Sequence, residues 1–409
     1  MSEKIKVSDA VQKTYETVKS NPKVKQAFDF LVPDQEKRLE EQIAIAKIPA
    51  FSYHEEERAN AMKDYFRQYG LTDITTDRFG NVYGVRRGTG NGPKVLIDAH
   101  TDTVFPLYTK LEPKFEGNKV YMPGITDDAS GLAAMLSVLR ALNHEGIETT
   151  GDLYFAGIVE EEPGIFGMHK FIAENTFDAV ISLDCAGSHW FAYGASSECD
   201  FEIRFRSMEE RFSLRKYSPC LTAAARAAVK FSEYKQEERT FLLVDNITSD
   251  PHKGQGCTTS LTKLNIQVRA CTHEGMAQAS SAIRQIAEEA CAEENARFEE
   301  PPVTFEIIKN EALSPAPQNP DNPICGAAYK VISEISGQTP LVTETGNSNS
   351  GAAIRAGIQA VTLGTGGMHG GIHSLDEFFD TTDMHKGPQS IMLIALMMTG
   401  IKDVCEPLA

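Results

Sequence analysis

Four strand-like apolar segments of this 409-residue chain lead into acidic residues or histidine, and this pattern most constrains its fold. The segments are residues 94–99, 153–159, 179–183 and 360–363. Helical patterns alternate with them, which predicts βαβ units and an α/β fold class. Ligands of an open α/β sheet gather outside the carboxyl ends of its strands. We therefore expect the polar residues that follow these segments to converge on one site.

Histidine and carboxylate side chains stand at or shortly after these segment ends, and such groups are the usual ligands of divalent metals in proteins. The sequence therefore predicts a metal site along this edge of the sheet. The candidate residues in chain order are His100, Asp102, Asp127, Asp128, Glu160, Glu161, Glu162, Asp184, His369 and His373.

Some of these residues also have ordinary structural interpretations. Acidic residues 127–128 suit the first turn of a helix, where backbone N–H groups favour anions. The acidic run 160–162 is typical of a solvated face, and Asp184 fits an exposed loop equally well when taken alone. In the Gly-rich loop, we prefer His373 as a ligand and retain His369 as the alternative.

Composition excludes several functions. A formal net charge of -17 argues against binding nucleic acid or anionic membranes. Apolar residues make up 41% of the chain, but no uninterrupted run reaches the roughly 18 residues of a membrane span. The first residues are polar, and the eight cysteines are scattered without a C-x-x-C pair. We therefore expect a cytoplasmic protein without a secretory signal.

A different pattern begins after residue 194. It reads strand, helix, strand, strand, helix and strand, which is the order of a ferredoxin-like α+β domain. We expect residues 195–312 to form an inserted domain of this kind. Residues 1–194 and 313–409 then form the two parts of one catalytic domain.

Five short motifs occur in order along the chain and together resemble one enzyme family. The family is that of the co-catalytic di-zinc peptidases and amidohydrolases, which includes peptidase T, carboxypeptidase G, aminoacylase and succinyl-diaminopimelate desuccinylase. The resemblance covers nearly the whole chain and implies a mixed-sheet catalytic domain with helices on both faces and an inserted lid or dimerisation domain. The motifs are AHTDTVFP (99–106), GITDDASG (124–131), EEPGIFG (161–167), ISLD (181–184) and HSLDEF (373–378).

The resemblance implies two Zn²⁺ ions per subunit, with Co²⁺ or Mn²⁺ as alternatives. Each ion would be held by one histidine and two carboxylates, and one carboxylate would be shared. His100, Asp127 and Asp184 would form the first set. Asp127, Glu162 and His373 would form the second.

Three further features follow from the resemblance. Glu161 would act as general base and then as general acid, and Asp102 would support the metal site. The peptide bond between Asp127 and Asp128 would be cis.

The implied function is a zinc-dependent metallopeptidase that hydrolyses short peptides with a hydroxide bridging the two metals. It would be a di- or tripeptide exopeptidase and a homodimer. One alternative is an N-acyl amino-acid amidohydrolase with the same metal centre, and another is a catalytically weakened zinc-binding homologue. The expected partner is thus a small peptide or an N-acyl amino acid.

The chain departs from the family pattern in its inserted domain and near its C-terminal part. Where the family carries a Gly-His-Ser motif, our placement finds residues 211–213, so Phe212 replaces the histidine. Residues 347–351 stand where Ser-Thr-Asp-x-Asn is common. Arg269 lies in a predicted strand where relatives carry an arginine that faces substrate or interface, and we retain it as a substrate-binding candidate.

Overall fold

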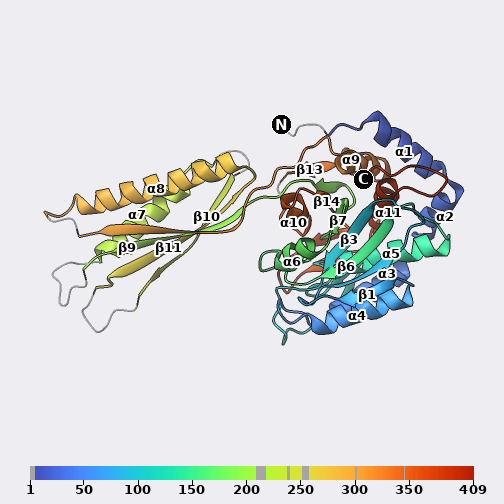
Figure 1. The fold of residues 1–409 in the computed structure, drawn as a ribbon. Coiled ribbons are helices and arrows are strands. Elements are labelled where there is room, and N and C mark those ends of the chain that lie inside the picture. The colour runs from blue at the N-terminus through green and yellow to red at the C-terminus, as the bar shows by residue number, and fades with distance from the viewer. Residues whose placement is uncertain (1–4, 209–217, 237–239, 251–257, 300–301, 345) are drawn as a thin grey trace. The chain divides into compact units, whose positions relative to one another are not determined.

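The chain forms two compact units (Figure 1). The structure is a computed structural model that describes residues 5–208, 218–236, 240–250, 258–299, 302–344 and 346–409. The first unit comprises Met1–Ala195 and Gln318–Ala409, and the second comprises Ser196–Pro317. The sequence predicts a return to the first domain a few residues earlier, at 313. The structure groups the Pro-rich stretch up to residue 317 with the inserted unit.

The first unit is a mixed α/β structure. Its helices are α1 (Asp9–Ser20), α2 (Pro22–Phe30), α3 (Gln35–Ala46), α4 (Glu56–Gln68), α5 (Ala129–His144), α6 (Phe166–Glu174), α9 (Pro323–Ser336), α10 (Ser350–Arg355) and α11 (Lys386–Thr399). Its strands are β1 (Thr72–Thr76), β2 (Val82–Arg86), β3 (Lys94–His100), β4 (Lys114–Glu116), β5 (Lys119–Tyr121), β6 (Asp152–Ile158), β7 (Ala179–Leu183), β8 (Trp190–Ala192), β13 (Leu341–Thr343), β14 (Gln359–Leu363), β15 (Met368–Gly370) and β16 (Phe378–Asp380).

Eight strands form the central sheet in the order β1-β2-β6-β3-β7-β14-β8-β13. The middle of the sheet is parallel, because β6, β3, β7 and β14 pair with one another in the same direction. Strands β2 and β8 join it antiparallel, so the sheet is mixed. A smaller sheet of order β15-β16-β5-β4 holds the segment that follows the Gly-rich loop.

Helices cover both faces of the central sheet. Helices α5 and α11 pack on one side of β3, and α6 and α10 lie on the other side near β7 and β14 (Figure 1). Strand β7 is buried along its whole length, as expected for a parallel strand covered on both faces. Apolar side chains of α5, α11 and the central strands form one continuous core.

Helix α5 begins at the GITDDASG motif, and its sequence explains its start. Asp128 stands at the N-cap, and its Oδ1 accepts a hydrogen bond from the Gly131 N–H at 2.9 Å. A Cβ atom at residue 131 would lie 2.4 Å from both carboxylate oxygens of Asp128. Only glycine at this position therefore allows the aspartate to cap the helix so closely.

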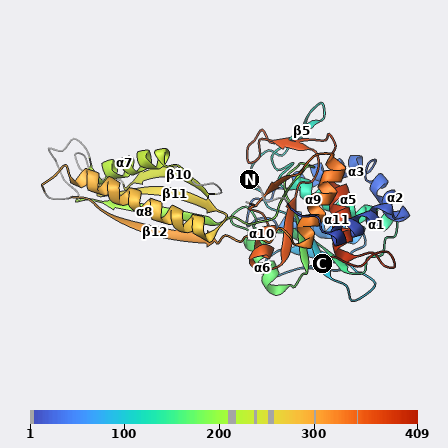
Figure 2. The same cartoon turned by 90° about the horizontal axis from the view of Figure 1, so that it is seen from above.

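The second unit consists of a four-stranded antiparallel sheet and two helices that lie on one face of it (Figures 1 and 2). The strand order β10-β11-β9-β12 is that of a ferredoxin-like fold, and the unit has a hydrophobic core of its own. The elements are β9 (Glu198–Arg206), α7 (Pro219–Glu233), β10 (Thr240–Ser249), β11 (Leu261–Ala270), α8 (His273–Asn295) and β12 (Thr304–Leu313).

The predicted fold class is confirmed: a mixed central sheet carries helices on both faces, and a ferredoxin-like unit is inserted. Strands β8 and β13 and the strands of the small sheet were not predicted from the sequence, and each is three residues long. Three residues are too few to establish an alternating pattern.

The core of α5 yields a stability prediction. Leu136 is fully buried in this helix, so Leu136→Ala should lower the free energy of unfolding by about 2–5 kcal/mol through lost burial and a residual cavity. Guanidinium unfolding followed by circular dichroism measures the change. Lys13→Ala, at an exposed position of α1, should stay within about 0.5 kcal/mol of the parent. Equal effects of the two substitutions would contradict this account of the core.

Candidate metal centre

The acidic residues and histidines predicted from the sequence meet at the carboxyl edge of the parallel strands. His100 is the last residue of β3, and Asp184 directly follows β7. Glu162 lies in the turn after β6, and Asp127 lies just before α5. His373 comes from the loop between β15 and β16. Five segments that are far apart in the sequence thus supply side chains to one place.

Two groups of potential ligand atoms share the carboxylate of Asp127. One group is His100, Asp127 and Asp184, and the other is Asp127, Glu162 and His373. Within each group, the ligand atoms lie within 4.8 Å of one another, a spacing that a single cation can bridge. These are the two sets that the resemblance implies, whereas His369 belongs to neither group among the described residues.

The shared carboxylate points one oxygen at each histidine. His100 Nε2 lies 2.7 Å from Asp127 Oδ1, and His373 Nε2 lies 3.0 Å from Asp127 Oδ2. The second imidazole also lies 3.2 Å from Glu162 Oε2. The peptide bond between Asp127 and Asp128 is cis, as the resemblance predicts. The Asp127 side chain, just before α5, therefore reaches both ligand groups.

Asp102 connects the ligand histidine of β3 with the turn after β6. His100 Nδ1 lies 3.0 Å from the Asp102 carbonyl oxygen and 3.4 Å from Asp102 Oδ1. That carboxylate oxygen also accepts a hydrogen bond from the Glu161 N–H at 3.0 Å. Asp102 Oδ2 accepts from the Glu162 N–H at 3.1 Å and from the Ser52 hydroxyl at 2.8 Å. A carboxylate on the second ring nitrogen orients a histidine ligand, so this geometry suits the supporting role expected of Asp102.

Glu377 holds the loop that carries Asp127, and sequence analysis did not assign it a role. Its Oε1 accepts hydrogen bonds from the N–H groups of Thr126 at 2.8 Å and Asp127 at 3.1 Å. Its Oε2 accepts from the Gly124 N–H at 3.0 Å. Glu377 is part of the HSLDEF motif, so the motif itself was the available signal. Glu377 lies four residues after His373 and binds the backbone of Asp127, so it connects the segments that carry two ligands of the second group.

Two buried carboxylate oxygens at this site have no hydrogen-bond partner among the residues that the structure describes. They are Glu161 Oε1 and Glu162 Oε1. An unpaired carboxylate oxygen is costly to bury, and metal coordination would offset that cost at Glu162. The donors are imidazole nitrogens and carboxylate oxygens, which suit zinc and also other divalent transition metals. The residues present therefore fit a pair of divalent cations.

The electrostatics of the site favour added positive charge. Burial raises the pKa of Glu161 well above its usual range, and burial together with the Asp127 charge raises the pKa of Asp184 to about 6. Hydrogen bonds to Asp127 and Glu162 raise the pKa of His373 to about 10. Burial opposes a charge on His100, but hydrogen bonds to carboxylates outweigh it and raise its pKa. Metal binding would displace the protons from both histidines.

A second cluster of buried polar side chains surrounds Asp98, two residues before His100 in β3. Asp98, in the middle of β3, accepts hydrogen bonds from the Ser182 hydroxyl at 2.8 Å and from Asn349 Nδ2 at 2.8 Å. Burial raises the pKa of Asp98 to about 7. Asn349 thus connects the start of α10 to β3, the strand that ends at His100. It lies within residues 347–351, which depart from the family pattern.

Two further candidates lie in the second unit. Arg269 is exposed on β11, and its role as a substrate-binding residue stays a prediction. Phe212, in the position of the family's lid histidine, lies outside the described residues.

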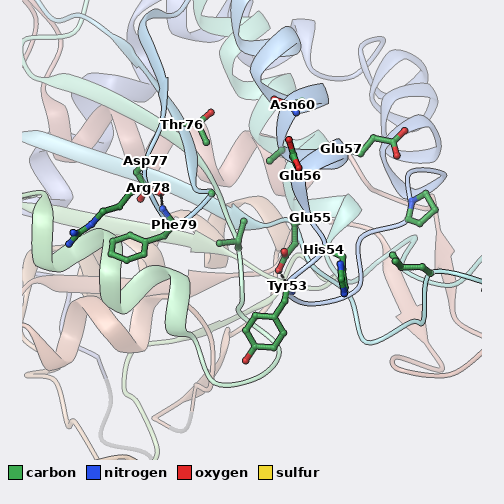
Figure 3. A pocket seen from close by; sticks show the side chains of 15 residues that line it. Tyr53, His54, Glu55, Glu56, Glu57, Asn60, Thr76, Asp77, Arg78 and Phe79 are labelled. Atoms are coloured by element: carbon green, nitrogen blue, oxygen red, sulfur yellow. Dashed lines mark hydrogen bonds between the residues drawn. The ribbon is translucent and has the colours of Figure 1, made fainter.

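A pocket of about 1010 Å³ borders the segment that precedes α4 (Figure 3). Tyr53, His54 and Glu55 lie along one side of it, and Val159, which directly follows β6, also lines it. The carboxylate of Glu55 accepts a hydrogen bond from the Glu160 N–H in the turn after β6.

The fold and the paired ligand groups are those of a metal-dependent hydrolase. Residues 96–396 match the sequence model of Peptidase family M20/M25/M40, and the chain belongs to this family. It is 23% identical to the Bacillus subtilis protein YqjE over 377 residues, which cover 88% of this chain and 98% of YqjE.

Solved structures agree in fold. A tripeptidase from Staphylococcus aureus superposes with a TM-score of 0.74 at 20% identity, covering 88% of this chain and 97% of its own. A hydantoinase/carbamoylase family amidase from Burkholderia ambifaria reaches a TM-score of 0.68 at 15% identity, covering 90% and 98%. At such identities, the likeness concerns the fold.

The contacts of Glu377 predict a loss of metal affinity on substitution. Glu377→Gln leaves one acceptor oxygen for three N–H groups and turns an NH₂ group toward the Gly124–Asp127 loop. We expect zinc affinity to fall about 10–100-fold, as for other residues that orient metal ligands. Competition titration with a chromophoric chelator measures it. Asp376→Asn, at the exposed neighbouring position, serves as the control and should bind zinc like the parent. Unchanged affinity in Glu377→Gln would refute the assigned role.

Proposed function

We propose that this protein is a zinc-dependent exopeptidase that hydrolyses short peptides at a pair of metal ions. The observation that carries the proposal is the sharing of Asp127 between two groups of ligand atoms, with the unpaired Glu161 carboxylate oxygen beside them. His100, Asp127 and Asp184 would hold one ion, and Asp127, Glu162 and His373 the other. Zinc suits the mixed nitrogen and oxygen donors, and Co²⁺ or Mn²⁺ are alternatives.

Bound in this way, the metals would polarise the scissile carbonyl group and lower the pKa of a water molecule to about 7. Glu161 would accept the proton of the attacking water and donate it to the leaving amine. Its burial supports both steps, because a raised pKa lets the same carboxyl group hold the proton between them. Asp102 would keep Glu161 in place, since its Oδ1 accepts the Glu161 N–H.

Similarity to the tripeptidase supports a short peptide as substrate. Similarity to the amidase keeps a second candidate open, an N-acyl amino-acid amidohydrolase with the same metal centre. Both reactions cleave an amide bond and need the same ligands, so the site residues do not separate them; substrate choice depends on the walls of the cleft. A catalytically weakened homologue is less well supported, because every predicted ligand and Glu161 are present.

We further propose a cytoplasmic homodimer. The described cysteines form no disulfide with one another, which suits a reducing compartment. None of the described helices has the length and hydropathy that a membrane crossing requires. Strand β10 is an edge of the second unit's sheet and exposes Phe241, Leu243 and Ile247, so another chain could pair along it.

The role of Glu161 leads to a direct prediction. Glu161→Gln removes the proton acceptor but keeps the size of the side chain, so we expect turnover to fall at least about 10²–10⁴-fold. Zinc content, measured by mass spectrometry, should stay equal to that of the parent, because Glu161 is outside both ligand groups. Glu160→Gln offers a neighbouring control, since its side chain pairs with Lys170 instead. Turnover that survives in Glu161→Gln would disprove the proposed role.

A substrate panel decides between the two candidate activities. Zinc-loaded protein is incubated with di- and tripeptides that have free N-termini and with N-acetyl and N-succinyl amino acids, and released amine is quantified. A peptidase should cleave the free peptides with kcat/KM at least about tenfold above the acylated amino acids, which is a difference of about 1.4 kcal/mol. The reverse preference would establish the amidohydrolase. No hydrolysis by the metal-loaded protein would favour the weakened homologue.

A further inference from the structure

The carboxylate of Glu55 makes its hydrogen bonds outside its own helix. Glu55 occupies the N-cap of α4, where polar side chains often accept a backbone N–H of the first turn, but it makes no such bond. Its Oε1 instead accepts hydrogen bonds from the Tyr53 N–H at 2.8 Å and the Glu160 N–H at 3.2 Å. The residue is only 5% exposed. This buried carboxylate therefore links the segment before α4 to the turn after β6.

That turn carries the proposed proton-transfer residue and one of the proposed metal ligands. Three consecutive backbone N–H groups of this turn donate to buried carboxylates. Glu160 donates to Glu55, while Glu161 and Glu162 donate to Asp102. Glu160 has a φ of 55°, a left-handed conformation that is uncommon for residues other than glycine. Such a conformation persists only where its surroundings fix it, and Glu55 supplies one of those fixed contacts.

Residues 48–58, which contain Glu55, are also fastened to the end of β3. The Ser52 hydroxyl donates to Asp102, and the buried Arg58 guanidinium donates to the Thr101 carbonyl at 3.1 Å. The Thr103 N–H donates to the Ala50 carbonyl at 2.8 Å. Through these bonds, the segment has a fixed place relative to His100 and Asp102. Because this segment is fixed to the end of β3, Glu55 can hold the turn after β6 in a defined position relative to the ligands.

We propose that Glu55 is a positioning residue for catalysis, which aims Glu161 by holding the backbone of Glu160. This inference rests on the proposed function, in which Glu161 transfers the proton. Helix capping does not explain the residue, since its side chain bonds no N–H of α4. Burying a carboxylate is costly unless its oxygens are paired, and here Oε1 pairs with two backbone groups of the segments it joins. Figure 3 shows Glu55 beside Tyr53 on the pocket wall.

Three variants isolate this contact. Glu55→Ala removes the acceptor, whereas Glu55→Gln keeps an amide oxygen that can accept both N–H bonds. Glu57→Ala, at an exposed acid in the first turn of the same helix, controls for lost negative charge at the N-terminus of α4. All three are made in the full-length chain.

The first measurement does not depend on activity. Hydrogen–deuterium exchange is followed in chelator-treated protein for the peptide that covers residues 159–167. In Glu55→Ala, we expect exchange in this peptide to become about tenfold faster, because the Glu160 N–H loses its acceptor and the turn opens more often. Glu55→Gln and Glu57→Ala should exchange like the parent. Faster exchange throughout the first unit would instead indicate general destabilisation and would overturn the proposal.

The second measurement separates positioning from binding. Zinc-loaded variants hydrolyse L-alanyl-L-alanyl-L-alanine under initial-rate conditions. A misplaced Glu161 should lower kcat about 100-fold in Glu55→Ala, with KM within about threefold of the parent because the substrate contacts are kept. Zinc content should be unchanged, and Glu55→Gln should recover most of the rate.

The two measurements fail in different ways. If the parent protein hydrolyses neither this tripeptide nor the wider panel, the proposed function fails, and the exchange experiment still decides whether Glu55 holds the turn. If the parent is active but Glu55→Ala matches it in kcat and in exchange, the positioning role is wrong while the peptidase assignment stands. A drop in kcat that Glu55→Gln does not rescue would also contradict the role, since the amide preserves the acceptor.

Discussion

The arrangement of the site depends on one carboxylate, that of Asp127, which faces an imidazole with each of its oxygens. A side chain shared in this way requires that two ligand groups from different parts of the chain be held on either side of it. Burial alone would raise the pKa of this aspartate, but the hydrogen bonds from His100 and His373 outweigh burial and lower it. Contacts to the Asp127 backbone and to both of its carboxylate oxygens hold this ionised group in place.

Three layers of backbone contacts hold the site. The parallel strands β3, β6 and β7 bring their carboxyl ends to one edge, which sets the approximate positions of the ligands. Asp102 and Glu377 then fix the local backbone by accepting N–H groups of the turns that carry the ligands. Glu55 extends the same principle outward. At Asp102, Glu377 and Glu55 alike, a buried carboxylate accepts backbone N–H groups, which lowers the cost of burying it.

Much of this could be predicted from the sequence. The apolar strands and the residues that follow them were recognisable because the pattern of a buried parallel strand ends abruptly at a charged residue. The ligand groups followed from the family resemblance, and the structure brings those same residues together. It also places His373, not His369, with the other ligand atoms, a choice that the Gly-rich loop left open.

The supporting residues could not be predicted in the same way. Glu55, Ser52 and Arg58 belong to no recognised motif, and each has a hydrogen-bond partner more than forty residues away in the chain. Contacts of this kind appear only when the strands are placed side by side. The short strands β8 and β13 were missed for a related reason, since their pairing, more than their own sequence, defines them.

The most direct test of the account is a crystal structure of the zinc-loaded protein with anomalous diffraction recorded at the zinc absorption edge. We expect two anomalous peaks per chain, one on each side of the Asp127 carboxylate. The first should be within bonding distance of His100 and Asp184, and the second within bonding distance of Glu162 and His373, about 2.0–2.2 Å from each ligand atom. A single peak that Asp127 does not share, or peaks elsewhere on the chain, would contradict the central claim.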